Sequence, residues 1–298
     1  MDEWPALPYE DWRLTRDTLH MYTQIVGKLR LALSPFEPEW ANVPLYVTAR
    51  GLTTSPVPVG LRTFDAEFDF ADHQLVLRAS DGGIERVTLR QPAVADFYAA
   101  VMDALRRLDF EVTISPGPSE VPDPIPFADD RTHHTYEPAQ VNGFFHVLSA
   151  VDVVLKQYRS HFRGKTSPAQ FFWGSFDHVV TRFSGRPVEP PADADRITRY
   201  GGDAEQICGG FWPGHPQFPS PAFFAYGYPK PEGIDQASIR PAGAAWNADL
   251  GEFIFPYDAM RTAPDPSRAL LDFLQSSYDA SADALGWDPV LTRINAPS

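Results

Sequence analysis

Residues Ala169-Gln-Phe-Phe-Trp-Gly-Ser-Phe-Asp-His-Val-Val-Thr-Arg-Phe-Ser184 form one run of aromatic, β-branched and ionisable side chains, bounded by Pro168 and Gly185. Such residues favour extended structure, so we predict one long strand over this run. Side chains alternate across a strand. One face then carries Phe171, Trp173, Ser175, Asp177, Val179 and Thr181, and the other carries Phe172, Phe176, His178, Val180 and Arg182. Both faces are largely apolar, which indicates a sheet covered on both sides.

Asp177 is the charged residue in the middle of this apolar run. A buried, unpaired carboxylate is costly, so we expect Asp177 to meet a cation, a hydrogen-bond donor or solvent in a cleft. Lys165, Arg182 and Arg186 are the nearby cations. Two interpretations stay open. Asp177 either forms an ion pair that fixes the strand, or faces a ligand beside Trp173 as a candidate catalytic acid or base.

The composition of the 298-residue chain is that of a globular protein, with 43% hydrophobic and 13% aromatic residues. These fractions are ample for a packed core. The formal net charge is -14 at pH 7, and Lys and Arg do not cluster in a run. We therefore expect no nucleic acid and no membrane surface as a partner, because both are anionic.

The compartment is predicted from the N-terminus and from cysteine usage. The first ten residues lack a basic segment followed by an apolar one, so no secretory signal is expected. A single cysteine, Cys208, excludes an intrachain disulfide. We expect a cytoplasmic protein.

Helical periodicity predicts four long helices: from about Glu10 to Leu33, from Val94 to Leu108, from Pro138 to about Gly164, and from Ser267 to Leu285. On the flank of the first helix, His20, Gln24 and Lys28 recur every four residues. Polar groups at this spacing are typical of a solvated or partly buried helix edge, and that is our interpretation of the row.

Strands and loops complete the predicted order of elements. We predict strands at 43–54, 62–70, 74–78, 86–89, 111–114, 222–228, 242–247 and 252–257. Five prolines make 115–127 an extended connector. The segment 187–221 is rich in Pro, Gly and Asp, and we interpret it as a long loop that is either a lid or disordered.

The chain repeats the order helix, strand, hairpin, helix. The first half is 10–114, a Pro-rich connector is 115–137, and the second half is 138–288 with the insertion 187–221. At one constant shift along the chain, the residues Gln24, Arg30, Ser34 and Pro35 fall on Gln157, Arg163, Ser167 and Pro168. We predict an α+β fold of two pseudo-equivalent halves with mainly antiparallel sheets, packed as one body through an internal duplication.

A cleft between two such halves is a usual ligand position. The candidate ligand-binding residues around it are Gln24, Lys28, Tyr46, Arg50, Lys165, Trp173, Ser175 and Arg182, with Asp177 as the candidate catalytic group. Basic side chains beneath aromatic ones suit a small carboxylate or phosphate. The predicted function is therefore a small-molecule-binding protein or an enzyme acting on a small anionic molecule.

The alternative is a structural or protein-interaction module. In that case the charged strand residues pair internally, and the aromatic residues Phe211 and Trp212 meet a protein partner. No cofactor is predicted, because the chain has no phosphate-binding glycine loop, no HExxH and no GxSxG. No metal site is predicted either, since the adjacent His133 and His134 lack a further ligand at a recognised spacing.

Five strings carry a resemblance to a known family: 4–9 (WPALPY), 23–28 (TQIVGK), 44–54 (PLYVTARGLTT), 171–177 (FFWGSFD) and 181–186 (TRFSGR). In these strings the chain resembles an uncharacterised bacterial protein family, a domain of unknown function. The resemblance covers nearly the whole chain. It implies a single full-length unit of bacterial origin, and it implies no activity and no catalytic residues.

Overall fold

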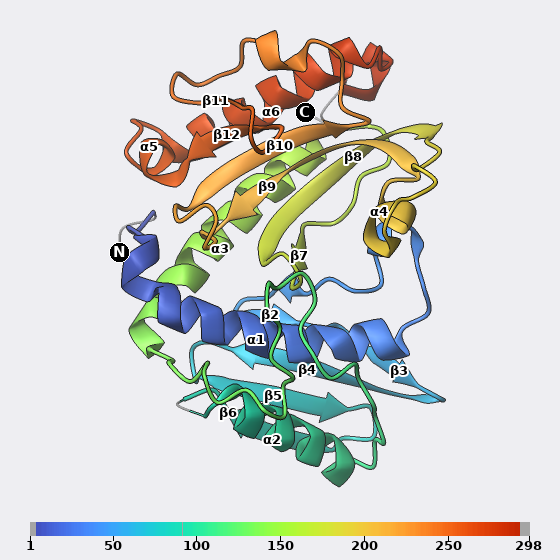
Figure 1. Ribbon diagram of the computed structural model, residues 1–298, viewed down its shortest axis with the longest axis vertical. Coiled ribbons are helices and arrows are strands. Elements are labelled where there is room, and N and C mark those ends of the chain that lie inside the picture. Colours follow the sequence, from blue (N-terminus) through green and yellow to red (C-terminus); the bar gives the residue numbers. More distant parts are fainter. Residues whose placement is uncertain (1–3, 91, 293–298) are drawn as a thin grey trace.

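Two antiparallel sheets and the helices packed on them form the protein, and the computed structural model describes residues 4–90 and 92–292 (Figure 1). The helices are α1 (Tyr9–Leu33), η1 (Pro38–Trp40), α2 (Val94–Arg107), α3 (Pro138–Ser160), α4 (Arg196–Gly201), η2 (Ile234–Gln236), α5 (Tyr257–Arg261), α6 (Pro266–Ala284) and η3 (Pro289–Thr292). This architecture confirms the predicted α+β class with antiparallel sheets.

The first sheet has the strand order β1-β2-β4-β5-β6, and β3 also pairs with β4. Its strands are β1 (Tyr46–Val47), β2 (Gly51–Thr53), β3 (Val57–Val59), β4 (Arg62–Asp69), β5 (Gln74–Ala79) and β6 (Ile84–Thr88). Alternate residues of β4 are buried, among them Phe64, Ala66 and Phe68, as expected for a strand with one face on the core. The helix α2 packs against the β6 end of this sheet.

The second sheet has the order β11-β12-β10-β9-β8-β7. Its strands are β7 (Gln170–Phe172), β8 (Asp177–Pro187), β9 (Ala204–Trp212), β10 (Ala222–Tyr228), β11 (Ala245–Asn247) and β12 (Glu252–Pro256). The helices α3 and α6 pack on one face of this sheet. The shorter elements α4 and η1 lie on the side of its other face.

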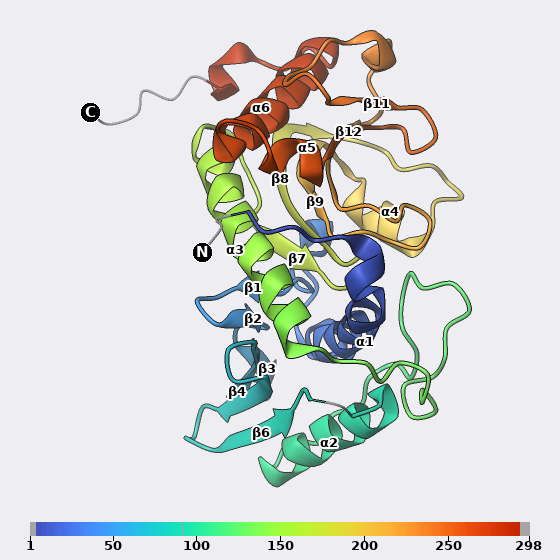
Figure 2. The same cartoon turned by 90° about the vertical axis from the view of Figure 1, so that its left-hand side faces the viewer.

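The helix α1 lies between the two sheets (Figures 1 and 2). Leu19, Tyr22 and Ile25 are fully buried, so α1 is a core element with little solvated surface along most of its length. Acidic residues in its first turn suit the positive end of the helix dipole. The helix ends before Pro35, whose ring does not fit a helix interior.

The predicted long strand over 169–184 is wrong, because the run is a hairpin. β7 ends at Phe172, residues 173–176 turn, and β8 starts at Asp177 opposite Phe172. Phe176 takes a left-handed φ of 61°, which an uninterrupted strand does not contain. The turn contains Gly174 and Ser175, residues typical of turns, and the aromatic neighbours hid that signal.

The expected loop over 187–221 also differs from the structure, since it contains α4 and the central strand β9. Pairing with β8 and β10 on its two sides stabilises β9 despite Gly209 and Gly210. Glycine is needed at position 210, because a Cβ at Gly210 would lie 2.6 Å from the carbonyl oxygen of His178. The strand predicted at 111–114 is not formed, and α3 ends at Ser160 rather than near Gly164.

The predicted first half contains α1, the first sheet and α2, and the predicted second half contains α3, the second sheet, α4, α5 and α6. They are joined where the edge strands meet: Leu45 and Phe171 exchange two backbone hydrogen bonds of 2.9 Å. The two sheets differ in detail. In the second sheet β11 pairs with the outer side of β12, whereas in the first sheet β2 and β3 both pair with β4. The internal duplication therefore stays a prediction.

Candidate functional site

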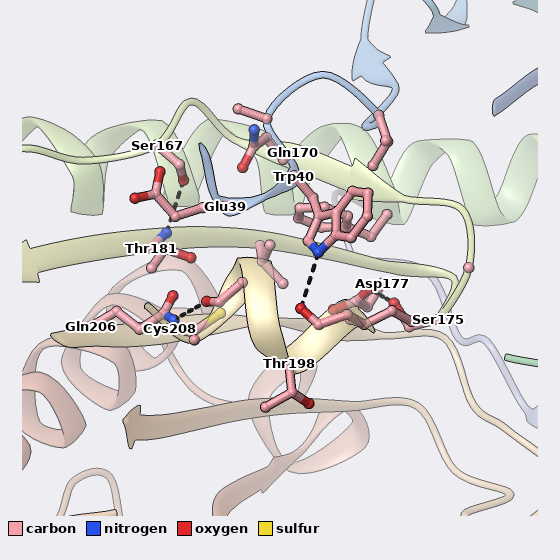
Figure 3. A pocket seen from close by; sticks show the side chains of 18 of the residues that line it. Glu39, Trp40, Ser167, Gln170, Ser175, Asp177, Thr181, Thr198, Gln206 and Cys208 are labelled. Carbon is pink, nitrogen blue, oxygen red and sulfur yellow. Dashed lines mark hydrogen bonds between the residues drawn. The ribbon is translucent and has the colours of Figure 1, made fainter. Parts of the chain in front are cut away.

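A pocket of about 720 Å³ lies on the face of the second sheet that α3 and α6 leave open (Figure 3). Its floor comes from β8, β9 and β10, and its walls come from the β7–β8 turn, η1, α4 and the connector at Ser119 and Glu120. We call it the Asp177 pocket. This volume is in the range of sites that hold a metabolite-sized ligand.

The strand pairing determines which side chains form the floor. Thr181 is paired with Cys208, and Cys208 with Tyr226, so these three side chains lie in one row across three strands. Residues two positions away along a strand share the same face, which adds Asp177 and Val179 on β8. The floor is therefore mixed, with an apolar centre and polar groups at its ends.

Asp177 is the buried acid of the floor, with 8% of its surface exposed. The hydroxyl of Ser175 donates a hydrogen bond to its carboxylate (Figure 3). Burial raises the pKa of Asp177 to about 7, and the nearby carboxylate of Glu120 adds to the increase. Among the described residues no cation pairs with Asp177, so the predicted ion pair with Lys165, Arg182 or Arg186 is not formed.

Glu252 on β12 is a second acid near the floor. Burial raises its pKa to about 7, and the charge of Asp177 contributes. Its Oε2 atom is buried without a hydrogen-bond partner in the described structure. Two carboxyl groups that titrate near neutral pH and repel each other are an arrangement that acid–base catalysis uses.

Cys208 lies between these acids and is buried. Burial raises the pKa of its thiol to about 12, and the negative charge of Asp177 contributes to the increase. The thiol therefore stays protonated at neutral pH and is no thiolate nucleophile.

The side wall of the pocket is Trp173 in the β7–β8 turn. Its indole packs on Gly27 of α1, where an added Cβ would lie 2.1 Å from the ring. The indole Nε1 donates a 2.9 Å hydrogen bond to the carbonyl of Val43. The ammonium of Lys28 lies 5.5 Å from the ring centroid, within cation–π range. The contacts with Gly27, Val43 and Lys28 therefore hold the Trp173 side chain in place.

The polar row of α1 holds the segments around the pocket, and the interpretation of this row as a solvated edge is wrong. His20, Gln24 and Lys28 are all buried. His20 Nε2 lies 3.0 Å from the carbonyl oxygens of residues 173 and 174. Burial lowers the pKa of His20 to about 3, so the neutral ring donates to these carbonyls.

Gln24 and Lys28 bind the connector. The Gln24 amide donates to the carbonyl of Ser119 at 2.8 Å and accepts from its backbone N–H at 3.0 Å. The Lys28 ammonium donates to the hydroxyls of Ser115 and Ser119. Both predicted ligand-binding residues therefore act behind the wall, positioning Ser119 and Glu120, and do not line the pocket.

Three other predicted ligand-binding residues lie elsewhere. Arg182 is fully buried on the opposite face of β8, where its guanidinium lies 3.5 Å from the centroid of the Tyr158 ring. Strand alternation explains this, since Arg182 follows the floor residue Thr181. Arg50 pairs with acids of the first sheet, and Tyr46 packs beside Arg30. Of the predicted site residues, Lys165, Trp173, Ser175 and Asp177 line the pocket.

The outer wall consists of η1 and α4. The Trp40 indole donates a 3.0 Å hydrogen bond to the carbonyl of Ile197 (Figure 3). The guanidinium of Arg196 lies over the same ring. Glu39 and Trp40 both take left-handed φ angles, 55° and 57°. Consecutive non-glycine residues in this region are strained, and such strain is often found in segments that contact ligands.

Several lining residues were not predicted, among them Trp40, Glu120, Gln206 and Tyr226. The alternation of Gln206 and Cys208 with Ile207 and Phe211 is a strand signal that the surrounding glycines and prolines concealed. Trp40 and Glu120 lie in irregular segments, and nothing in their local sequence indicates that they reach the second sheet.

A family model described as a family of unknown function (DUF5996) matches residues 4–293. The chain belongs to this family. Comparisons with curated proteins and with solved structures find no match. Within the described residues no group of three or more His, Cys, Asp or Glu side chains is arranged to hold a metal ion. Among the described helices, none is long and apolar enough to cross a bilayer.

Proposed function

We propose that this protein binds a small organic molecule in the Asp177 pocket and that Asp177 exchanges a proton with it. The observation that carries the proposal is a buried carboxyl group, unpaired with any cation among the described residues, on the floor of a 720 Å³ pocket. A structural carboxylate in such a place is normally neutralised by a cation. A group whose pKa lies near 7 is suited to act as a general acid or base.

The pocket does not gather the four cations that the predicted anionic ligand requires. That prediction needed Lys28, Arg50, Lys165 and Arg182 to converge, and of these only Lys165 lines the pocket. Lys165 is exposed at the mouth, together with Arg196. The floor instead carries Asp177.

The alternative, a protein-interaction module, was predicted from exposed aromatic residues, and these residues are buried or packed on the sheet. Phe211 was expected on an exposed loop that meets a partner, but it is a fully buried residue of β9. Trp212 is half-buried and stacks on Phe224, with ring centroids 4.6 Å apart. The described structure also has a cavity beside Trp173, whereas a purely structural module has no need of one.

The test combines mass spectrometry with variants of the pocket. We expect native spectra of the purified protein, or thermal-shift screening of a metabolite library, to find a bound small molecule whose extra mass is lost on denaturation. Asp177→Asn should weaken the binding at least about tenfold. The matched control is Asp249→Asn, an exposed carboxylate in the β11–β12 turn.

A second variant, Val179→Phe, adds volume to the floor, and circular dichroism verifies that it folds. It should abolish binding by occupying the cavity. A ligand whose affinity is the same in the wild type, Asp177→Asn and Val179→Phe binds elsewhere and contradicts the proposal.

A further inference from the structure

The charged residues of the Asp177 pocket are distributed by depth. The cations Lys165 and Arg196 and the acid Glu120 are exposed residues at its mouth, and the acid Glu39 there is half-buried. On the floor, the charged side chain among the described lining residues is Asp177. The deep end of the pocket is therefore negative when Asp177 is ionised, and the mouth carries both signs.

The surroundings of Asp177 make the deep end more negative. Glu120 acts on Asp177 from the connector, and Asp177 on β8 acts across β9 and β10 on Glu252 of β12. Cys208 and Tyr226 face it from β9 and β10 and are neutral at pH 7, because the pKa of each is raised. An anionic group placed there is repelled, whereas a cation is attracted in a site that excludes most water.

The walls above the floor are aromatic. Phe172 and Trp173 line the pocket at the β7–β8 hairpin, Trp40 lines it from η1, and the ring of Tyr226 belongs to the floor on β10. The faces of aromatic rings attract organic cations, particularly where the cation has lost its water. Aromatic walls over a buried carboxylate are thus a combination that suits an ammonium group attached to an apolar body.

We infer that the ligand of the Asp177 pocket is an organic amine, bound as the ammonium ion with its charged end at Asp177 and its apolar body between the aromatic walls. This inference depends on the proposed binding function and specifies its ligand class. The net charge of -14 favours the approach of such a cation. The opposite orientation places the ammonium among Lys165 and Arg196 and leaves Asp177 without a partner.

The test uses three probes of nearly equal shape and different charge: 3-phenylpropylamine, 3-phenylpropanol and 3-phenylpropanoate. Calorimetric titration at pH 8 should find the amine bound at least about tenfold more tightly than the alcohol, and the carboxylate bound most weakly. In Asp177→Asn the affinity for the amine should fall to that for the alcohol, which itself stays unchanged. Asp249→Asn should keep the wild-type order.

Other outcomes overturn the inference. The alcohol or the carboxylate could bind as tightly as the amine or more tightly, with this binding lost in Val179→Phe. That result supports the pocket as a binding site and contradicts an amine as its ligand class. If Asp177→Asn still binds the amine more tightly than the alcohol, the ammonium group does not bind at Asp177, and the inference is wrong. Binding of none of the probes overturns the amine inference, and the proposed function falls with it only if native spectra and the library screen also find no ligand.

Discussion

Asp177 combines a functional position with a cost in stability. Its carboxyl group ionises in water with a pKa of 3.8, and burial raises that pKa to about 7 in the folded protein. Between these values the folded state binds the proton more tightly than the unfolded state does, so the free energy of unfolding decreases as pH rises from 4 to 7. Below 4 this group has no effect, and above 7 its cost is constant.

The first prediction follows from this linkage. Asp177→Asn should raise the free energy of unfolding at pH 8 by up to roughly 4 kcal/mol, since each pKa unit corresponds to about 1.4 kcal/mol. The increase should shrink towards zero near pH 4, because the wild-type carboxyl is then protonated and uncharged, like the asparagine amide. Urea unfolding at pH 4, 6 and 8 measures it, with Asp249→Asn as the control. If Asp177→Asn is less stable than the wild type at pH 8, Asp177 is not a buried carboxylate without a cation.

The second prediction concerns Arg50, which the sequence had placed in the site. In the structure its half-exposed guanidinium pairs with the buried carboxylate of Asp69 and with the exposed carboxylate of Asp72. Removing the cation from a buried carboxylate is destabilising, although the backbone N–H groups of Ala71 and Asp72 still donate to Asp69. Arg50→Met should therefore lower the urea midpoint and leave ligand affinity near the wild-type value. The ligand is the one whose binding Asp177→Asn weakens. Loss of its binding in Arg50→Met would show that Arg50 belongs to the binding site.

At the scale of elements, the contact between α1 and the β7–β8 turn determines the shape of the pocket. Gly27 is an unusual residue for a helix interior, where glycine is unfavourable. Its missing side chain provides the space that the Trp173 indole occupies. The cost in helix propensity is offset by a close contact that positions the pocket wall.

The third prediction tests this contact. Gly27→Ala gains about 1 kcal/mol of helix propensity, but the added methyl group overlaps a rigid ring, and overpacking costs about 1–3 kcal/mol. We expect a net loss of stability of about 1 kcal/mol and weaker ligand binding, measured by urea unfolding and calorimetry.

The control for this variant is Gly143→Ala in α3, where an added Cβ meets nothing within 4 Å. It should raise stability by about 0.5–1 kcal/mol, because only the propensity term remains. Equal increases in both variants would show that Trp173 does not need the space at Gly27.

For the whole molecule, the two halves share one hydrophobic core. The main buried cluster includes Ile25 and Phe68 from the first half together with Leu155 and Phe171 from the second. The backbone bonds between Leu45 and Phe171 cross the same boundary. Neither half therefore buries its apolar surface without the other, and we expect them to unfold together.

The fourth prediction is a single unfolding transition. Hydrogen exchange followed by mass spectrometry across a urea series should find that peptides from β4–β5 and from β9–β10 lose protection at the same urea concentration. Loss of protection in the first sheet at clearly lower urea identifies the halves as independent units.

What the sequence determined by itself is the set of elements with strong local patterns. The helices α1, α2 and α6 and the strands β4, β5 and β10 begin and end within about two residues of the predicted bounds, because periodicity and flanking prolines are local signals. The sequence also singled out Asp177, Ser175 and Trp173, since ionisable groups among aromatic residues are visible in one stretch. The hairpin and β9 were missed where aromatic and glycine residues gave conflicting local signals.

What only the tertiary structure decided is which groups meet. The burial of Gln24 and Lys28 depends on a connector that returns to α1 from far along the chain. Likewise, Trp40 and Glu120 reach the pocket only because α1, η1 and the connector pack against the second sheet. Contacts between distant segments arise from the packing of the whole core, and local sequence carries no record of them.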